Sequence, residues 1–330
     1  MYLRPNDVEV LHMEWTSRCP LFCQQCARTD WEVGKAVMPT LPMGDMKPDF
    51  VDKILPQFPN VDVLHVCGNY GDIIAYPYLL ETLDIVNKHE IPMTRLYTNG
   101  SARTTEYWEQ VAKKLKGTMT FSIDGLEDTN HIYRVGSNWN KVMESAKAFI
   151  DAGGYAIWEM LVFEHNQHQV EEAKQLSEQM GFKRFRVKRA SRFTVYDKAD
   201  QEATSVKPTS VKEFKHINQD IVGIDKKQIV CKYKKAKWIY VSFEGDMFPC
   251  CWTGANKYKK FQNRNEIWQL FETHGKDFLN LNNHSADQVF EHTWFSEQLE
   301  KSWNTDPLKV CSKQCLEKLQ EHEDLQYANT

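Results

Sequence analysis

Three cysteines near the start of the chain carry the clearest chemical signal. Cys19, Cys23 and Cys26 follow the spacing C-x3-C-x2-C within one short run. Four thiolates fully ligate a cubane iron–sulfur cluster, so three would leave one iron open to bind a substrate or cofactor. A redox pair does not need Cys19, and a zinc knuckle usually shows paired cysteines or histidines at matching spacing. The spacing therefore favours an iron–sulfur site.

A second set of thiols lies in the last third of the chain, in two distant segments. Its members are Cys231, Cys250, Cys311 and Cys315. Four thiols suit a fully ligated cubane or a four-cysteine zinc site, and both interpretations stay open. Of the two remaining cysteines, Cys67 is most simply a small buried apolar residue. Cys251, next to a candidate ligand, is most simply a bystander thiol.

The composition sets the broad class. The chain has 330 residues, of which 42% are hydrophobic and 26% charged, and this is globular rather than disordered composition. A formal charge of −4 gives no general attraction to nucleic acid or acidic membranes. No apolar run of about eighteen residues and no signal-peptide core occur, so we expect a cytoplasmic protein. In a reducing cytosol, clustered thiols more often bind metal or do chemistry than form disulfides.

These thiols must be positioned by a regular scaffold. Six short apolar runs predict strands over Val8–Trp15, Val61–Val66, Met93–Tyr97, Thr118–Ile123, Ala156–Phe163 and Arg184–Lys188. Helical patterns between or beside them cover Asp49–Leu55, Tyr78–His89, Thr105–Lys116, Asn140–Ala152 and Gln167–Met180. Gly153–Gly154 and Gly181 stand where helices should end. Alternating strands and helices predict an α/β fold with a parallel sheet, either open and doubly wound or closed into a full or partial barrel.

Functional residues should gather where these strands end. The expected ends are Trp15–Cys26, Cys67–Asp72, Thr98–Ser101, Ser122–Gly125, Glu164–Asn166 and Arg189–Arg192. They are rich in Cys, Asn, Asp, Ser and Gly, as a ligand-binding rim should be. On the sixth strand, alternation places Arg184, Arg186 and Lys188 on one face, which we interpret mainly as solvated. Arg189 shares the apolar face and approaches the strand's end, so it is the basic candidate for the site.

The pattern changes in the last third of the chain. We divide the chain into residues 1–203 and 204–330. In the second part, Trp238–Phe243 reads as a strand, Glu244–Asp246 as a hairpin turn and Met247–Cys250 as the return strand. Helices are expected at Glu266–Phe271, Ala286–Thr293 and Ser296–Trp303.

The first part resembles the radical S-adenosylmethionine (SAM) superfamily. Its hallmark is the same cysteine triplet, in the loop after the first strand of a partial (β/α)6 barrel. The run Gly68-Asn69-Tyr70-Gly71-Asp72 is similar to the glycine-rich acidic motif that holds the SAM amino group, although the family's usual final residue is Glu. The resemblance implies that the cofactor-binding residues are Gly68, Asn69, Tyr70, Gly71, Asp72, Asn99, Ser122, Asp124, Asn166 and Arg189.

The resemblance also implies a chemistry. SAM would chelate the open iron of a 4Fe–4S cluster held by Cys19, Cys23 and Cys26. An electron donor such as flavodoxin or ferredoxin would reduce that cluster. SAM would then break into methionine and a 5′-deoxyadenosyl radical, which abstracts hydrogen from a substrate.

The second part resembles the auxiliary-cluster domains of such enzymes, of the SPASM and shorter Twitch types. Their opening signature matches Cys231-x13-Gly245-x4-Cys250. Too few cysteines are present for two further clusters, so one auxiliary 4Fe–4S cluster, ligated by Cys231, Cys250, Cys311 and Cys315, fits better. A structural zinc site is the alternative. Cys251 is left over and is a candidate hydrogen donor to a substrate radical.

The resemblance therefore predicts a radical SAM oxidoreductase. We expect a peptide substrate that is crosslinked, epimerised or oxidised, although few residues precede the first strand to form a leader-binding domain. The second choice is a small molecule such as a sugar, aminocyclitol or nucleotide. A hypothesis of another class is a non-enzymatic iron–sulfur or zinc protein, for which an open iron has little use. Membrane and nucleic-acid partners are not expected.

Overall fold

The protein was analysed as a computed structural model that describes residues 2–30, 35–190, 205–214, 229–258 and 266–315. Within these residues, the strands form an eight-stranded sheet of order β10-β9-β1-β4-β5-β6-β7-β8 and a small pair, β2 (Thr29–Asp30) with β3 (Ala36–Val37). The six predicted strands correspond to β1 (Val10–Met13), β4 (Val63–Val66), β5 (Met93–Thr98), β6 (Gly117–Ser122), β7 (Tyr155–Val162) and β8 (Arg184–Arg189). Each pairs in parallel with the next.

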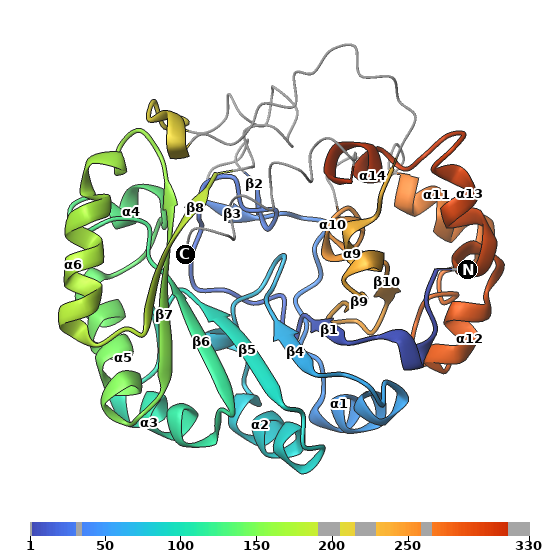
Figure 1. Cartoon of the computed structure of the whole chain (residues 1–330), viewed down its shortest axis with the longest axis horizontal. Helices are drawn as coiled ribbons and strands as arrows, with labels where there is room; N and C mark the ends of the chain where they lie inside the picture. The colour runs from blue at the N-terminus through green and yellow to red at the C-terminus, as the bar shows by residue number, and fades with distance from the viewer. Residues whose placement is uncertain (1, 31–34, 191–204, 215–228, 259–265, 316–330) are drawn as a thin grey trace.

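Helices connect these strands and line the outer side of the curved sheet (Figure 1). They are α1 (Pro48–Ile54), α2 (Leu79–Lys88), α3 (Thr105–Lys114), α5 (Trp139–Asp151) and α6 (Val170–Met180). The Asn138 side chain caps α5 by accepting from the Lys141 amide, and Gly181 ends α6 in the left-handed conformation. The predicted partial (β/α)6 barrel is confirmed.

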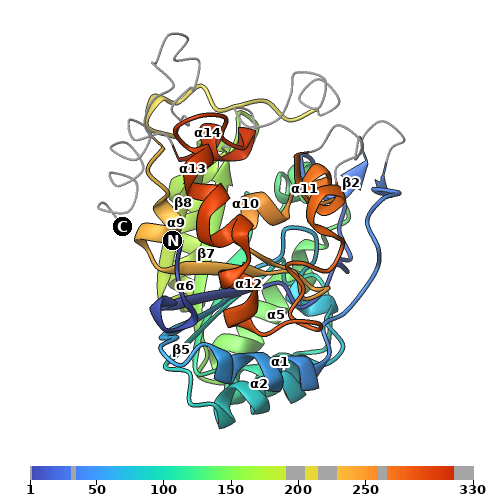
Figure 2. The same cartoon turned by 90° about the vertical axis from the view of Figure 1, so that its right-hand side faces the viewer.

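Shorter elements fill the connections. They are η1 (Pro5–Asp7), η2 (Leu55–Gln57), η3 (Ile73–Ala75), α4 (Asn130–Tyr133), η4 (Gln167–Gln169) and η5 (Lys212–Phe214). In the last third they are α9 (Lys232–Lys235), α10 (Cys251–Gly254), α11 (Glu266–His274), α12 (Ala286–Glu291), the π-helix η7 (Trp294–Gln298), α13 (Leu299–Ser302) and α14 (Lys309–Gln314). The helices α12, α13 and α14 follow one another along one side of the molecule (Figure 2).

The predicted hairpin of the last third joins the barrel sheet. Strand β9 (Trp238–Val241) pairs in parallel with β1, with Val10 opposite Trp238. Strand β10 (Met247–Phe248) returns antiparallel to β9 through a turn in which Gly245 has φ +90°. A Cβ atom on Gly245 would lie 2.6 Å from Asn282 Nδ2, so the turn needs glycine. The predicted boundary between residues 203 and 204 lies outside the described residues.

One hydrophobic core runs from the N-terminal segment to the C-terminal helices. It contains Tyr2, the strand residues Leu11 and Leu64, and Phe295 of η7, all of them buried. The Tyr2 ring lies 5.9 Å from the Phe295 ring and its hydroxyl donates to the Pro249 carbonyl at 3.2 Å. Among the described helices, none combines the length and apolar character needed to cross a membrane.

Candidate active site

The cysteine triplet occupies a braced loop after β1. The amide of Phe22 donates to the Val135 carbonyl at 2.9 Å, and the amide of Gln24 donates to the Tyr133 carbonyl at 3.1 Å. The buried Arg28 guanidinium donates to the carbonyls of Ser17 and Leu21 at 3.3 and 3.2 Å. These contacts fix the loop although its own backbone forms no helix or strand around the cysteines.

The three thiols of this loop lie near one another. Burial, with Asp72, Cys23 and Cys26 nearby, raises the pKa of Cys19. The Cys19 sulfur accepts from the Leu21 amide at 3.5 Å and from Asn99 Nδ2 at 3.6 Å. Convergent thiols that are largely buried and receive N–H donors fit an iron–sulfur cluster, in which such hydrogen bonds tune the metal.

The loop of residues 68–72 follows β4, which is the second of the six predicted strands, and we therefore call it the strand-two loop. It touches the triplet loop. The Asp72 amide donates to the Arg18 carbonyl at 2.8 Å. A Cβ atom on Gly71 would lie 1.8 Å from the Thr16 carbonyl oxygen, so only glycine permits this close approach. The strand-two loop is thus packed directly against the chain that leads to Cys19.

The buried carboxylate of Glu14 accepts hydrogen bonds from the backbone of this loop. Its Oε1 atom accepts from the amides of Tyr70 and Gly71 at 2.7 and 3.1 Å, and its Oε2 accepts from the Tyr240 hydroxyl at 2.5 Å. Burial raises the pKa of Glu14 to about 7, although these hydrogen bonds act in the opposite direction. Glu14 therefore joins β1, β9 and the strand-two loop.

Asp72 makes an internal network at the start of η3. Its carboxylate accepts from the Ile74 amide, the Thr98 hydroxyl, and both the amide and Nδ2 of Asn99, at 2.7 to 3.0 Å. Burial raises its pKa despite these donors. Asp72, Asn99 and Cys19 therefore form one connected group at the carboxyl ends of β4 and β5.

The ends of β6 and β7 form a second connected group. Asp124 is fully buried, pairs with Arg134 Nε at 2.6 Å and accepts from the Leu161 amide at 2.6 Å. Asn166 Nδ2 donates to the carbonyls of Asp124 and Leu161, both at 2.9 Å. Arg134 also acts electrostatically on Asp72 and Cys23, so its charge lies near the first group as well. Ser122 ends β6, half-buried, opposite Glu159 in the β-ladder.

Strand β8 leaves Arg184 and Lys188 exposed, as predicted for a mainly solvated face, and Arg186 half-buried. Arg186 and Lys188 both pair with Glu159 of β7, at 3.5 and 3.3 Å, and Glu159 is nearly buried. Arg189, the predicted site residue, donates from Nε to the Glu213 carbonyl of η5 at 2.9 Å. Arg189 is thus joined to η5, and its role in the site stays a prediction.

The four predicted auxiliary ligands come together from two distant segments, Cys231 and Cys250 from one and Cys311 and Cys315 from the other. Cys231 and Cys315 share a hydrogen bond, which lowers the pKa of Cys231 and raises that of Cys315. Cys250 and Cys311 lie close enough to act electrostatically on Cys231, and burial raises the pKa of both. The Cys231 sulfur also accepts from the Lys234 amide at 3.4 Å. In the described part of the chain, no three His, Cys, Asp or Glu side chains are arranged to hold a single metal ion.

Cys251 has different surroundings from its neighbour Cys250. Its sulfur lies 3.8 Å from the Tyr233 hydroxyl. Burial raises its pKa to about 11, and Cys67 at the end of β4 acts on it electrostatically. Burial, and after it the neighbouring thiols of Cys251, Cys250 and Cys315, raise the pKa of Tyr233. Cys251 therefore lies between the auxiliary thiols and the barrel.

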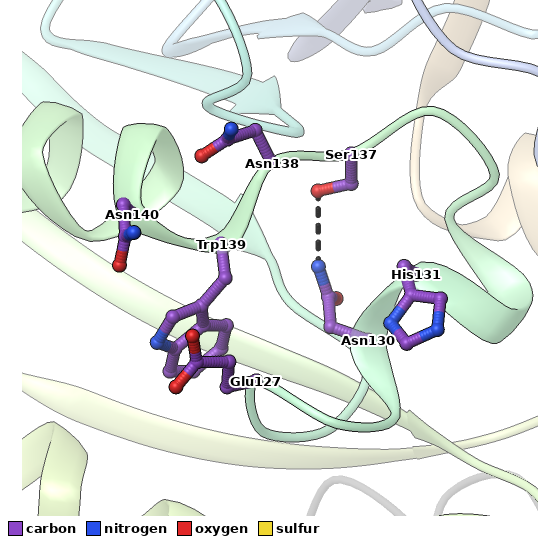
Figure 3. Close-up of a pocket in the computed structure, with 7 residues that line it drawn as sticks. All are labelled: Glu127, Asn130, His131, Ser137, Asn138, Trp139 and Asn140. Atoms are coloured by element: carbon purple, nitrogen blue, oxygen red, sulfur yellow. Dashed lines mark hydrogen bonds between the residues drawn. The ribbon is translucent and has the colours of Figure 1, made fainter.

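A hollow of about 260 Å³ opens beside the start of α5 (Figure 3). Its walls are polar except for the indole of Trp139. Asn130, buried beneath it, donates to the Ser137 hydroxyl at 3.0 Å and accepts from the Asp124 amide at 2.8 Å. The hollow thus abuts the Asp124 group. The lining residues are Glu127, Asn130, His131, Ser137, Asn138, Trp139 and Asn140.

Three residues of the site were not predicted from the sequence: Glu14, Arg28 and Arg134. Glu14 left a weak signal, a charged residue at the end of a strand whose neighbours are buried. Arg28 and Arg134 belong to no local pattern, because their partners Leu21 and Asp124 are brought to them only by folding.

Comparisons with known proteins agree with this architecture. No family model matches the chain. Over 132 residues, 39% of this chain, it is 27% identical to the tungsten-containing aldehyde ferredoxin oxidoreductase cofactor-modifying protein of Pyrococcus furiosus. Over 121 residues, 36% of this chain, it is 23% identical to the FeMo cofactor biosynthesis protein NifB of Methanocaldococcus infernus. These matches span only 34% and 40% of the two relatives.

Solved structures match nearly the whole chain. Streptococcus suis SuiB bound to precursor peptide SuiA matches 91% of this chain and 65% of its own, with TM-score 0.54 and 19% identity. The enzyme anSMEcpe with bound AdoMet, which is SAM, matches 97% of this chain and 92% of its own, with TM-score 0.56 and 13% identity. The chain therefore has the fold of radical SAM enzymes, with a barrel followed by a hairpin-and-helix part, as the sequence predicted.

Proposed function

We propose that this chain is a radical SAM enzyme that carries one auxiliary iron–sulfur cluster and modifies a peptide. The observation that carries the proposal is the convergence of Cys19, Asn99 and Asp72 at the carboxyl ends of neighbouring parallel strands. The buried triplet would hold a 4Fe–4S cluster with one open iron. When bound, the cluster and SAM together supply the radical that abstracts hydrogen from the substrate.

The strand-two loop suits the amino group of SAM through its main chain. The amide N–H groups of Tyr70 and Gly71 donate to Glu14. Because the peptide bonds are trans, the carbonyls of Asn69 and Tyr70 in the same peptide units point in the opposite direction, away from Glu14. Carbonyl oxygens directed this way can accept from an ammonium group. The carboxylate of Asp72 already accepts four hydrogen bonds. Asp72 would therefore hold the shape of the loop, while the carbonyls of Asn69 and Tyr70 would contact the SAM amino group directly.

Arg134 suits the carboxylate of SAM. Its Nε donates to Asp124, and a guanidinium has four further N–H donors. Its electrostatic action on Cys23 and Asp72 supports a role for that charge beside both parts of the proposed cofactor site. Arg134→Gln should therefore weaken SAM binding without lowering the iron content.

A peptide substrate is supported by the solved structures. SuiB is bound to a precursor peptide and anSMEcpe to the Cp18Cys peptide, and this chain shares their fold over most of its length. A small molecule is the second candidate, because both curated relatives are named for work on metal cofactors. With either substrate, an electron donor such as flavodoxin or ferredoxin would reduce the cluster. We class the proposed enzyme as a radical SAM oxidoreductase.

The decisive experiment is anaerobic incubation of iron-reconstituted protein with SAM and a chemical reductant. We expect 5′-deoxyadenosine and about eight iron atoms per chain, the content of two 4Fe–4S clusters. Changing Cys19, Cys23 and Cys26 together to Ala should halve the iron and abolish SAM cleavage. The control Cys67→Ala should keep the iron. Cleavage by the triple variant would show that the cofactor site lies elsewhere.

Cys251 is proposed as the hydrogen donor if the reaction is an epimerisation. Its position between Tyr233 and Cys67 supports this role, because the thiol lies on the barrel side of the auxiliary ligands. Solvent deuterium should then enter the product, and Cys251→Ala should still form 5′-deoxyadenosine but stall before product. Absence of deuterium together with an unimpaired variant would favour a net oxidation.

A further inference from the structure

The strand-two loop is bonded directly to the segment that follows the auxiliary ligand Cys250. Asn69 Nδ2 donates to the Cys251 carbonyl at 3.0 Å. The Tyr70 hydroxyl donates to the Ala255 carbonyl at 2.6 Å. Both carbonyls belong to α10 or to the residue that ends it. The proposed SAM loop and the auxiliary segment therefore share two hydrogen bonds between residues far apart in the sequence.

A third connection passes through Glu14. The Tyr240 hydroxyl of β9 donates to the same carboxylate that accepts the Tyr70 and Gly71 amides. The Tyr240 ring lies directly under α10, since a Cβ atom on Gly254 would be 2.3 Å from the ring. Any movement of α10 would therefore press on the residue that anchors Glu14.

Helix α10 cannot hold itself in place. It has four residues, and a helix of that length is unstable without tertiary contacts. Its anchors are the contacts just described and Cys250 itself, whose sulfur lies 3.3 Å from the Thr253 hydroxyl. Coordination of Cys250 together with Cys231, Cys311 and Cys315 would fix the start of α10 covalently.

From these contacts we propose that occupancy of the auxiliary site sets the shape of the strand-two loop and thereby tightens SAM binding. Asn69, Tyr70, Glu14 and Tyr240 are the positioning residues of this coupling. The inference rests on the proposed function. Because coupling between two binding sites is reciprocal, bound SAM should raise the equilibrium affinity of the auxiliary site for its cluster by the same factor.

The test measures SAM affinity by anaerobic equilibrium dialysis of the full chain, without reductant. Tyr70→Phe and Tyr240→Phe each remove a hydroxyl group that joins these segments, and we expect the Kd for SAM to rise about threefold to tenfold. Tyr258→Phe is the matched control: this buried hydroxyl has no hydrogen-bond partner among the described residues, and its ring packs 5.5 Å from that of Tyr70. Its Kd should stay at the wild-type value.

The auxiliary site itself is emptied by Cys311→Ser, with iron analysis to establish that only one cluster remains. This variant should bind SAM about threefold to tenfold more weakly, and adding Tyr70→Phe to it should change the Kd little further, because both changes break the same connection. Hydrogen exchange without SAM gives a second measurement: peptides covering residues 68–72 should exchange faster in Cys311→Ser.

Two results separate the ideas. If Cys311→Ser loses half its iron yet keeps wild-type SAM affinity and exchange, the coupling is overturned while the SAM site stands. If wild-type protein with both clusters does not bind SAM, the proposed function itself fails. Exchange of residues 68–72 still decides whether the auxiliary site orders that loop.

Discussion

Buried carboxylates dominate the site at the scale of single residues. Glu14 is buried and Asp72 is half-buried, and loss of solvation is the largest influence on the pKa of each. Glu14 links three elements through one side chain, and Asp72 links β4 to β5. Their replacement should therefore affect loop geometry more than direct ligand contact.

Glu14 makes stability depend on pH. Its pKa is about 7 in the folded protein against 4.5 when exposed, so the folded state keeps a proton that the unfolded chain has released. The free energy of unfolding should consequently fall as the pH rises from about 4.5 to 7, by about 3 kcal/mol for this group. Glu14→Gln, which keeps an acceptor for the two amides, should flatten that part of the profile.

Urea unfolding of the metal-free protein between pH 4.5 and 8 measures this difference. The exposed Glu127→Gln serves as the control and should follow the wild-type curve. Identical slopes for wild type and Glu14→Gln would contradict the role given to Glu14.

Asp72→Asn tests the second carboxylate. The amide nitrogen of Asn would face N–H and O–H donors, leaving at least one of them unpaired at a cost of about 1 to 3 kcal/mol. We expect weaker SAM binding, measured by dialysis, with iron content unchanged. Unchanged SAM affinity would show that the strand-two loop keeps its shape without the charge.

The strand-two loop and the strands around it define the scale of elements. Gly71→Ala would drive a methyl group into the Thr16 carbonyl, 1.8 Å away, and neither backbone can move without disturbing β1 or β4. We expect loss of SAM binding and destabilisation by about 2 kcal/mol or more, measured by dialysis and urea unfolding. Gly153→Ala, where a Cβ meets nothing within 4 Å, should retain SAM binding even though Gly153 has φ +91°.

Most elements of the barrel were predictable because their signals are local. The ends of β5 and α3 fall within two residues of prediction, since apolar periodicity and capping residues lie within each segment. The pairing of β9 with β1 was not predictable, because strand partners are chosen by the whole fold. The cysteine sets were predicted because their spacing can be read within the sequence. Arg134 was found only through its contact with Asp124, which depends on the fold.

The two parts of the chain share one sheet and one core at the scale of the molecule. Val10 pairs with Trp238, and Tyr2 packs against Phe295 and Trp303. A chain cut after residue 203 would expose the edge of β1 and part of this core. We expect it to aggregate or unfold without a cooperative transition in urea, whereas the full chain unfolds cooperatively. Cooperative unfolding and SAM binding by the cut chain would instead identify residues 1–203 as an independent domain.

The pairing of β9 with β1 also determines when the sheet can be completed during synthesis on the ribosome. A ribosome adds about 5 to 20 residues per second, so β1 waits roughly 10 to 45 seconds between the synthesis of Val10 and that of Trp238. During that interval one edge of β1 is open to solvent or to a chaperone, and Glu14 lacks its Tyr240 partner. The hydrogen bonds that surround the triplet site are thus complete only after Tyr240 has been synthesised. Nascent chains stalled before Trp238 should not bind SAM, and delivery of iron to Cys19, Cys23 and Cys26 should follow the synthesis of β9.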